Sequence, residues 1–144
     1  SISHDATSPL AFIITGVNES ILYMTDTGYV SQKNRKYLNN LDYYIIESNH
    51  DVEMLMATKR PYFLKQRIHG DLGHLNNEYS AKMMVELIGD KTKEIVLAHL
   101  SEEANTKEKA LETYRKIFNQ NNLEFDNIKV ASQIDVVSGG NYED

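Results

Sequence analysis

The sequence predicts an α/β (α+β layered) fold, and two patterns in the chain support that prediction. Two apolar runs of strand type, residues 10–14 and 21–24, flank a turn and are typical of a β-hairpin. After them, helical patterns alternate with further strand-type runs, which indicates helices packed on a sheet. With 144 residues and no obvious linker, the chain is expected to be one domain, residues 1–144.

The later elements follow from their periodicity and end signals. Residues 76–88 predict a helix because apolar residues recur at helical spacing from Ala81 to Ile88, and Gly89 follows at once. Asn105 and Glu108 resemble a capping box, which predicts a second amphipathic helix. Shorter helices are expected over 31–39, over 51–57 and from Pro61 onward, and further strands over 43–46, 95–98 and 128–131.

Composition excludes several classes of protein. The net charge of −6 argues against a surface coated with nucleic acid, although a local basic patch is compatible with it. The chain has no cysteine, so disulfides and thiolate metal sites are excluded, and any metal site must use His, Asp and Glu. No apolar run approaches the roughly 18 residues of a membrane span, so we expect a cytoplasmic protein without membrane contact.

Three strand-type runs each end in a residue that can bind a metal or move a proton. The run from Ile21 ends at Asp26, the run from Tyr43 at Glu47, and the run from Ile95 at His99. In open α/β sheets, ligand sites gather outside the carboxyl ends of the strands. We therefore expect Asp26 and His99 to meet there, with Glu47 nearby.

The five histidines differ in their surroundings. His69 is expected to be structural or superficial, and His50 is little better placed. His4, His74 and His99 each lie in a predicted loop among small or polar residues, which suits a functional group. Imidazole and carboxylate together favour Zn²⁺ or Mn²⁺.

Five short motifs follow one another along the chain. They are Ser3-His4-Asp5-Ala6, Thr25-Asp26-Thr27-Gly28-Tyr29-Val30, Glu47-Ser48-Asn49-His50-Asp51, Gly73-His74-Leu75-Asn76-Asn77 and Leu97-Ala98-His99-Leu100-Ser101. In this order they resemble the motifs of the metallo-β-lactamase-fold hydrolases, most closely the WalJ/YycJ-like branch. The resemblance extends from residue 1 to about residue 115.

The resemblance implies a fold and a role for each matched residue. The family fold is an αββα sandwich with two divalent metals at the rim between its sheets. By resemblance, His4 binds the first metal, Asp26 bridges both, and His99 binds the second. His74 corresponds to a histidine near the leaving group and is expected to act as the general acid, with Glu47 orienting it.

One departure from the family pattern is large. The signature His-x-His-x-Asp-His, which supplies four of the metal ligands and precedes every motif seen here, is absent from the sequence. The simplest explanation is that these residues form the C-terminal portion of a longer enzyme; the other is a relative that has lost its metals. We expect this chain alone to be inactive and metal-poor. Association between copies is one way to cover apolar surface left by a missing neighbour.

The substrate class rests on the resemblance and on one local feature. Lys59, Arg60, Lys65 and Arg67 lie in a stretch without an acidic residue, interleaved with aromatic side chains. Such a patch could neutralise phosphates and stack a base, although a solvated basic helix face is an equally good interpretation. Together these features favour a phosphodiester substrate, DNA above all, over a β-lactam.

Two other functions remain open at this point. A non-catalytic binding module could keep the fold, lose its metals and use the basic patch to hold a partner. A phosphotransfer domain with Asp26 as acceptor ranks lower, because the haloacid-dehalogenase pattern needs an aspartate where this chain has Gly28.

Overall fold

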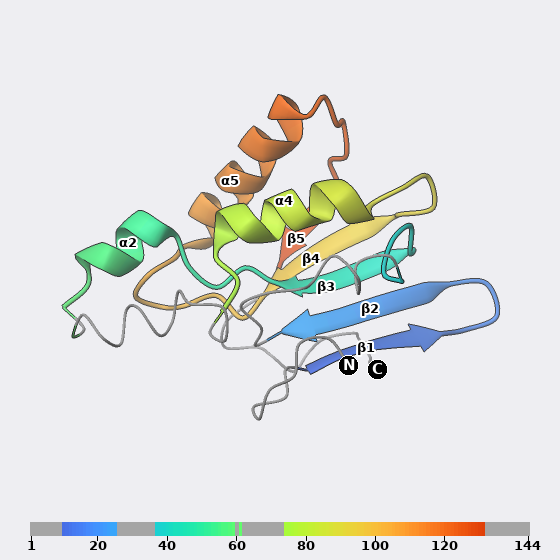
Figure 1. Cartoon of the computed structure of the whole chain (residues 1–144), viewed down its shortest axis with the longest axis horizontal. Coiled ribbons are helices and arrows are strands. Elements are labelled where there is room, and N and C mark those ends of the chain that lie inside the picture. The colour runs from blue at the N-terminus through green and yellow to red at the C-terminus, as the bar shows by residue number, and fades with distance from the viewer. Residues whose placement is uncertain (1–9, 26–36, 60, 62–73, 132–144) are drawn as a thin grey trace.

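The computed structural model describes residues 10–25, 37–59, 61 and 74–131, and these residues form one five-stranded sheet with the two longer helices on one face (Figure 1). The strands are β1 (Leu10–Thr15), β2 (Ser20–Thr25), β3 (Tyr43–Glu47), β4 (Glu94–Ala98) and β5 (Ile128–Val130). The helices are α2 (Val52–Ala57), α4 (Asn77–Leu87) and α5 (Lys107–Gln120). The predicted fold class is confirmed, whereas the single-domain assignment over 1–144 stays a prediction.

Spatial order in the sheet follows sequence order. β1 and β2 form the expected antiparallel hairpin, and β2, β3, β4 and β5 are parallel neighbours in that order. Each step between parallel strands therefore moves in the same direction across the sheet, and right-handed crossovers then fall on a single face. Helices α4 and α5 accordingly lie side by side on one face (Figure 1).

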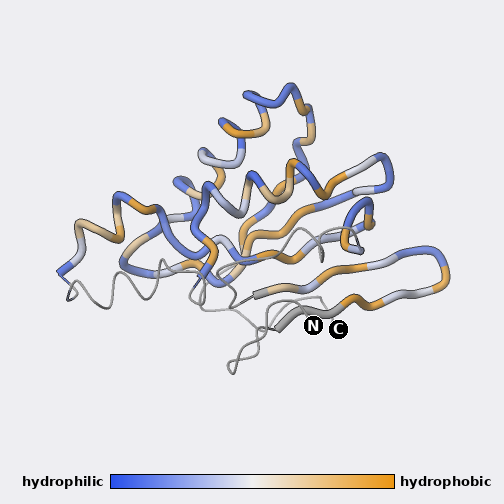
Figure 2. The backbone as a smooth tube through the Cα atoms, viewed as in Figure 1, coloured by the Kyte–Doolittle hydropathy of each residue, from blue (hydrophilic) through white to orange (hydrophobic). Residues whose placement is uncertain are grey.

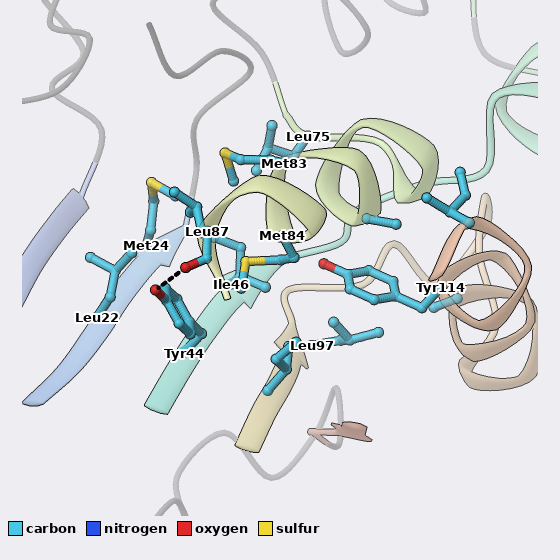
Figure 3. Close-up of a cluster of buried hydrophobic side chains, with 14 of the residues drawn as sticks. Leu22, Met24, Tyr44, Ile46, Leu75, Met83, Met84, Leu87, Leu97 and Tyr114 are labelled. Atoms are coloured by element: carbon cyan, nitrogen blue, oxygen red, sulfur yellow. Dashed lines mark hydrogen bonds between the residues drawn. The ribbon is translucent and has the colours of Figure 1, made fainter. Parts of the chain in front are cut away.

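Strand side chains alternate between that covered face and the opposite one. Leu22, Tyr44 and Ile95 point into the core and are buried, whereas their neighbours Ile45 and Val96 are only partly buried. Helix α4 inserts Met83, Met84 and Leu87 above these strands, and α5 contributes Tyr114 (Figure 3). In Figure 2 the strands carry most of the hydrophobic colour, and the helices alternate between hydrophilic and hydrophobic residues.

Helix starts are set by side-chain caps. Asp51 accepts a hydrogen bond from Met54 N at the start of α2, and Asn76 accepts one from Tyr79 N at the start of α4. The predicted capping box at Asn105 is wrong: Thr106 caps α5 by accepting from Lys109 N. Asn105 is instead buried, and its side chain bonds to other polar groups.

Some predicted elements fall outside the described residues. The helix expected from Pro61 onward lies outside the described residues, except for Pro61 itself. Most of the helix expected over 31–39 also lies outside them, and the described part, residues 37–39, forms a turn and bend. Among the described residues, no helix is long and apolar enough to cross a lipid bilayer.

Candidate active site

Three side chains that the sequence singled out lie together at the carboxyl edge of the sheet. Glu47 is the last residue of β3, and His99 directly follows Ala98, the last residue of β4 and the register partner of Glu47. His74 lies in the segment that leads to α4, whose cap residue is Asn76. Parallel pairing of β3 with β4 therefore places Glu47 and His99 next to each other, and the segment before α4 places His74 beside them.

One oxygen of Glu47 contacts both imidazoles. Oε2 lies 2.6 Å from Nδ1 of His74 and 2.7 Å from Nδ1 of His99. The other oxygen, Oε1, accepts a hydrogen bond from Leu75 N at 3.0 Å. The two rings stand beside each other, with centroids 5.4 Å apart and planes tilted by 52°.

These distances identify proton-bridged contacts. Glu47, His74 and His99 offer ligand atoms within 4.8 Å of one another, so they could in principle chelate one metal ion. Ligand atoms that share a tetrahedral zinc at about 2.0–2.2 Å must, however, lie about 3.3 Å or more from one another. Separations of 2.6 and 2.7 Å instead match charge-assisted hydrogen bonds. Each imidazole then donates its Nδ1–H to Glu47, and a neutral ring has its lone pair on Nε2.

The carboxylate is fully buried, while the rings reach the surface. The Glu47 side chain is 0% exposed, that of His74 30% and that of His99 44%. Burial alone would raise the pKa of Glu47, but the hydrogen bonds from both histidines, the positive charge of His74 and the Leu75 N–H together outweigh it. The pKa of Glu47 is consequently held below its ordinary value. A buried anion thus holds two partly exposed imidazoles.

His99 has an unusual backbone conformation. Its φ of 61° lies in the left-handed region, which residues other than glycine rarely adopt. Non-glycine residues keep such a conformation only where surrounding contacts impose it, and these positions gather at functional sites. One such contact comes from Asn49, whose Nδ2 donates to the His99 carbonyl oxygen at 2.9 Å.

A cluster of buried polar residues supports the site and was not predicted from the sequence. Asn77 and Asn105 exchange two amide hydrogen bonds, each 2.9 Å long. Ser48 Oγ donates to Asn77 Oδ1 at 2.6 Å, and Asn105 Nδ2 also contacts the carbonyl oxygens of Ser48 and Asn49. The available signal was weak: Asn and Ser residues beside predicted helix starts and strand ends usually indicate caps or turns.

The remaining predicted site residues divide into two groups. Lys59 is exposed beyond the end of α2, and it is the one basic-patch residue that the structure describes. The predictions for His4 and Asp26, and for Arg60, Lys65 and Arg67, lie outside the described residues. Asp26 is the next residue in the chain after β2, which pairs in parallel with β3. The roles assigned to all these residues stay predictions.

His50 lies inside the protein. It is fully buried, its Nδ1 lies 3.1 Å from Asn49 Oδ1, and its carbonyl oxygen accepts from Asn77 N. The sequence ranks His50 only slightly above His69 as a functional candidate, and its role stays a prediction.

Comparisons with known proteins give the relationship of the chain. It is 47% identical over 109 residues to the exodeoxyribonuclease WalJ of Streptococcus pneumoniae, an alignment that covers 76% of this chain and 40% of WalJ. It is 43% identical over 109 residues to the exodeoxyribonuclease YycJ of Bacillus anthracis, covering 76% of this chain and 41% of YycJ. The matched region is therefore about two fifths of the length of these curated relatives. No protein-family model matches the chain.

A solved structure gives the fold independently. The metallo-β-lactamase-fold protein YhfI of Bacillus subtilis superposes with a TM-score of 0.57 at 16% identity, over 85% of this chain and 41% of YhfI. At that identity the superposition establishes the fold alone. Sequence and structure agree: the chain has a metallo-β-lactamase type of fold, and its sequence is similar to the WalJ/YycJ branch of these proteins.

Proposed function

We propose that this chain is the part of a metal-dependent DNA phosphodiesterase that carries the general acid and some of the metal ligands. The relatives named exodeoxyribonucleases support a DNA substrate, and the fold supports hydrolysis. The observation that carries the proposal is the single Glu47 oxygen shared by His74 and His99. It joins the residue assigned to proton transfer directly to a residue assigned to metal binding.

The donor set fits a divalent metal. Metal-binding histidines commonly donate their second ring N–H to a carboxylate, which fixes the tautomer and makes the ligating nitrogen more basic. His99 has this arrangement, with Nδ1–H on Glu47, so it would coordinate through Nε2. His4 and Asp26 would be further ligands, and the remaining ones would come from residues outside this chain. Two ions, Zn²⁺ or Mn²⁺, would lower the pKa of a bound water and stabilise negative charge on the phosphate.

His74 would handle the leaving group. Hydrolysis forms a bond from water oxygen to phosphorus and breaks the bond to the leaving deoxyribose oxygen, which needs a proton. To act as the acid, His74 must carry a proton on both ring nitrogens. Because Glu47 holds the Nδ1–H, the proton delivered to that oxygen comes from Nε2, and the ring is left neutral with its lone pair there. Glu47 stays ionised throughout, since its pKa is held low, and it keeps the ring oriented as the proton leaves.

The test is DNA hydrolysis by the complete protein with Zn²⁺ or Mn²⁺ supplied. We expect Asp26→Ala and His99→Ala to lose metal and activity together. We expect His74→Ala to keep its metal and lose about 10²–10⁴-fold in rate, the usual contribution of a general acid. Glu124→Gln, an exposed carboxylate beyond α5, is the control and should match wild type.

Two results would count against the proposal. If Asp26→Ala and His99→Ala both cleave DNA as fast as wild type, the catalytic assignment is wrong. If the complete wild-type protein binds DNA but neither binds metal nor cleaves, the non-catalytic binding module is the better description. The 144-residue chain alone is expected to bind metal weakly and to be inactive.

A further inference from the structure

The left-handed backbone of His99 needs a group to hold it, and one side chain does so directly. The Nδ2 of Asn49 donates to the carbonyl oxygen of His99 at 2.9 Å, and this bond fixes the peptide group between His99 and Leu100. The ring of the same residue reaches Glu47 at 2.7 Å. Because a change in φ rotates the side chain together with the backbone, the Asn49 contact also determines where the imidazole points.

Asn49 is itself fixed on its other side. Its Oδ1 lies 3.1 Å from Nδ1 of the buried His50. The His99 carbonyl can only accept, so the NH₂ of Asn49 must face it; Oδ1 then faces His50, which donates through Nδ1–H. This assignment satisfies both partners of the amide and leaves it a single orientation.

The main chain of Asn49 ties the two histidine-bearing segments together. Asn49 N donates to the carbonyl oxygen of Leu75, the residue after His74, at 2.8 Å. Asn49 O accepts from the N–H of Ser101, two residues after His99, at 2.8 Å. One residue thus contacts both segments whose imidazoles meet on Glu47.

We propose that Asn49 is the positioning residue of this site: its side-chain amide imposes the left-handed conformation of His99 and so places that imidazole on Glu47 beside His74. The inference deepens the proposed function and rests on it for any effect on catalysis. The placement of the rings needs neither metal nor DNA, so it can be tested separately.

The test is NMR of the metal-free 144-residue chain at about pH 8, where an ordinary imidazole is neutral. In wild type we expect long-range ¹H–¹⁵N spectra to show a protonated Nδ1 on both His74 and His99. Asn49→Ala removes the donor, and Asn49→Asp keeps the shape but presents only acceptors. In both variants we expect His99 to lose the protonated-Nδ1 signature, while His74 keeps it.

Asn77→Ala is the matched control. Asn77 is buried like Asn49 and lies in the neighbouring polar cluster, but its side chain bonds to Ser48 and Asn105. We expect this variant to be less stable with the His99 signature intact. An unchanged His99 signature in both Asn49 variants would overturn the proposal, as would disappearance of that signature in Asn77→Ala to the same degree.

A wild-type measurement keeps the proposal falsifiable if the Asn49 variants fail to fold. The scalar coupling across the hydrogen bond from Asn49 Nδ2 to the His99 carbonyl carbon should be detectable in the deuterated chain. Absence of this coupling would overturn the inference. The DNA-hydrolysis experiment above tests the proposed function independently, because no enzyme activity enters either NMR measurement.

Discussion

Glu47 is a buried carboxylate whose hydrogen bonds come from three directions. Oε2 accepts from the two imidazoles, and Oε1 accepts from Leu75 N. A carboxylate can satisfy all three donors because it only accepts. An amide of the same shape cannot, since its NH₂ group must face either Leu75 N or the two Nδ1–H groups.

Glu47→Gln should therefore destabilise the protein by about 1–3 kcal/mol, the cost of leaving a buried donor unsatisfied. Urea unfolding at neutral pH measures this free energy. Glu124→Gln makes the same chemical change at an exposed position and should stay within about 0.5 kcal/mol of wild type. Equal stability of the two variants would mean that the three bonds to Glu47 contribute nothing net.

The same carboxylate predicts a pH dependence. The pKa of Glu47 in the folded protein lies below its ordinary value of 4.5, so the unfolded chain takes up the proton first as the pH falls. The stability that ionised Glu47 contributes is fully present above about pH 5 and is lost as the pH falls through the lower, folded-state pKa. The difference in unfolding free energy between wild type and Glu47→Gln should therefore shrink below about pH 4.5. A difference that grows on acidification would contradict the lowered pKa.

The sequence predicted which residues meet here only in part. It placed Glu47 and His99 at strand ends, and a family resemblance paired Glu47 with His74. It did not predict that one oxygen serves both rings, because that depends on the register of β3 with β4. It also did not single out Asn49. That residue contacts the left-handed peptide of His99, and a left-handed φ at a histidine cannot be recognised from the residue types.

Helices α4 and α5 are joined by a buried polar contact within an apolar interface. Ser80 Oγ and Tyr114 Oη lie 2.5 Å apart, and both residues are fully buried. The sequence predicted an amphipathic helix in this region, and Tyr114 lies on the buried face of α5. It did not predict the hydroxyl partner, because Ser80 belongs to a different helix.

A double-mutant cycle should expose this contact. Tyr114→Phe and Ser80→Ala each leave the partner hydroxyl buried without its bond, which should cost about 1–3 kcal/mol. The double variant removes both hydroxyls and should lose clearly less than the sum of the single variants. Thermal or urea unfolding of the four proteins measures the coupling. Strict additivity would mean that the two hydroxyls do not interact in solution.

The predicted basic patch is a surface feature that we expect to bind DNA. Changing Lys59, Arg60, Lys65 and Arg67 to Glu should weaken DNA binding and flatten its salt dependence, by about 0.9 in slope for each phosphate that is no longer neutralised. Affinities measured over a series of salt concentrations give that slope. The matched control is the same charge change at four exposed positions of α4 and α5, Lys82, Lys107, Arg115 and Lys116. Equal effects of the two sets would favour a solvated helix face over a DNA-binding patch.

The overall architecture was the most predictable feature of the chain. Alternating apolar runs and helical spacing predicted all five described strands and α2, α4 and α5. Strand order could not come from periodicity, because any order buries the same alternating residues.

In the proposed active site, Glu47 holds His99 as a metal ligand next to His74. Crystals of the complete protein soaked in Mn²⁺ or Zn²⁺ test it through the anomalous signal of the metal. We predict an ion coordinated by His99 Nε2 and by an Asp26 oxygen, with Glu47 still bonded to both Nδ1 atoms. An ion bound at Nδ1 of either ring, or Asp26 far from the ion, would contradict it.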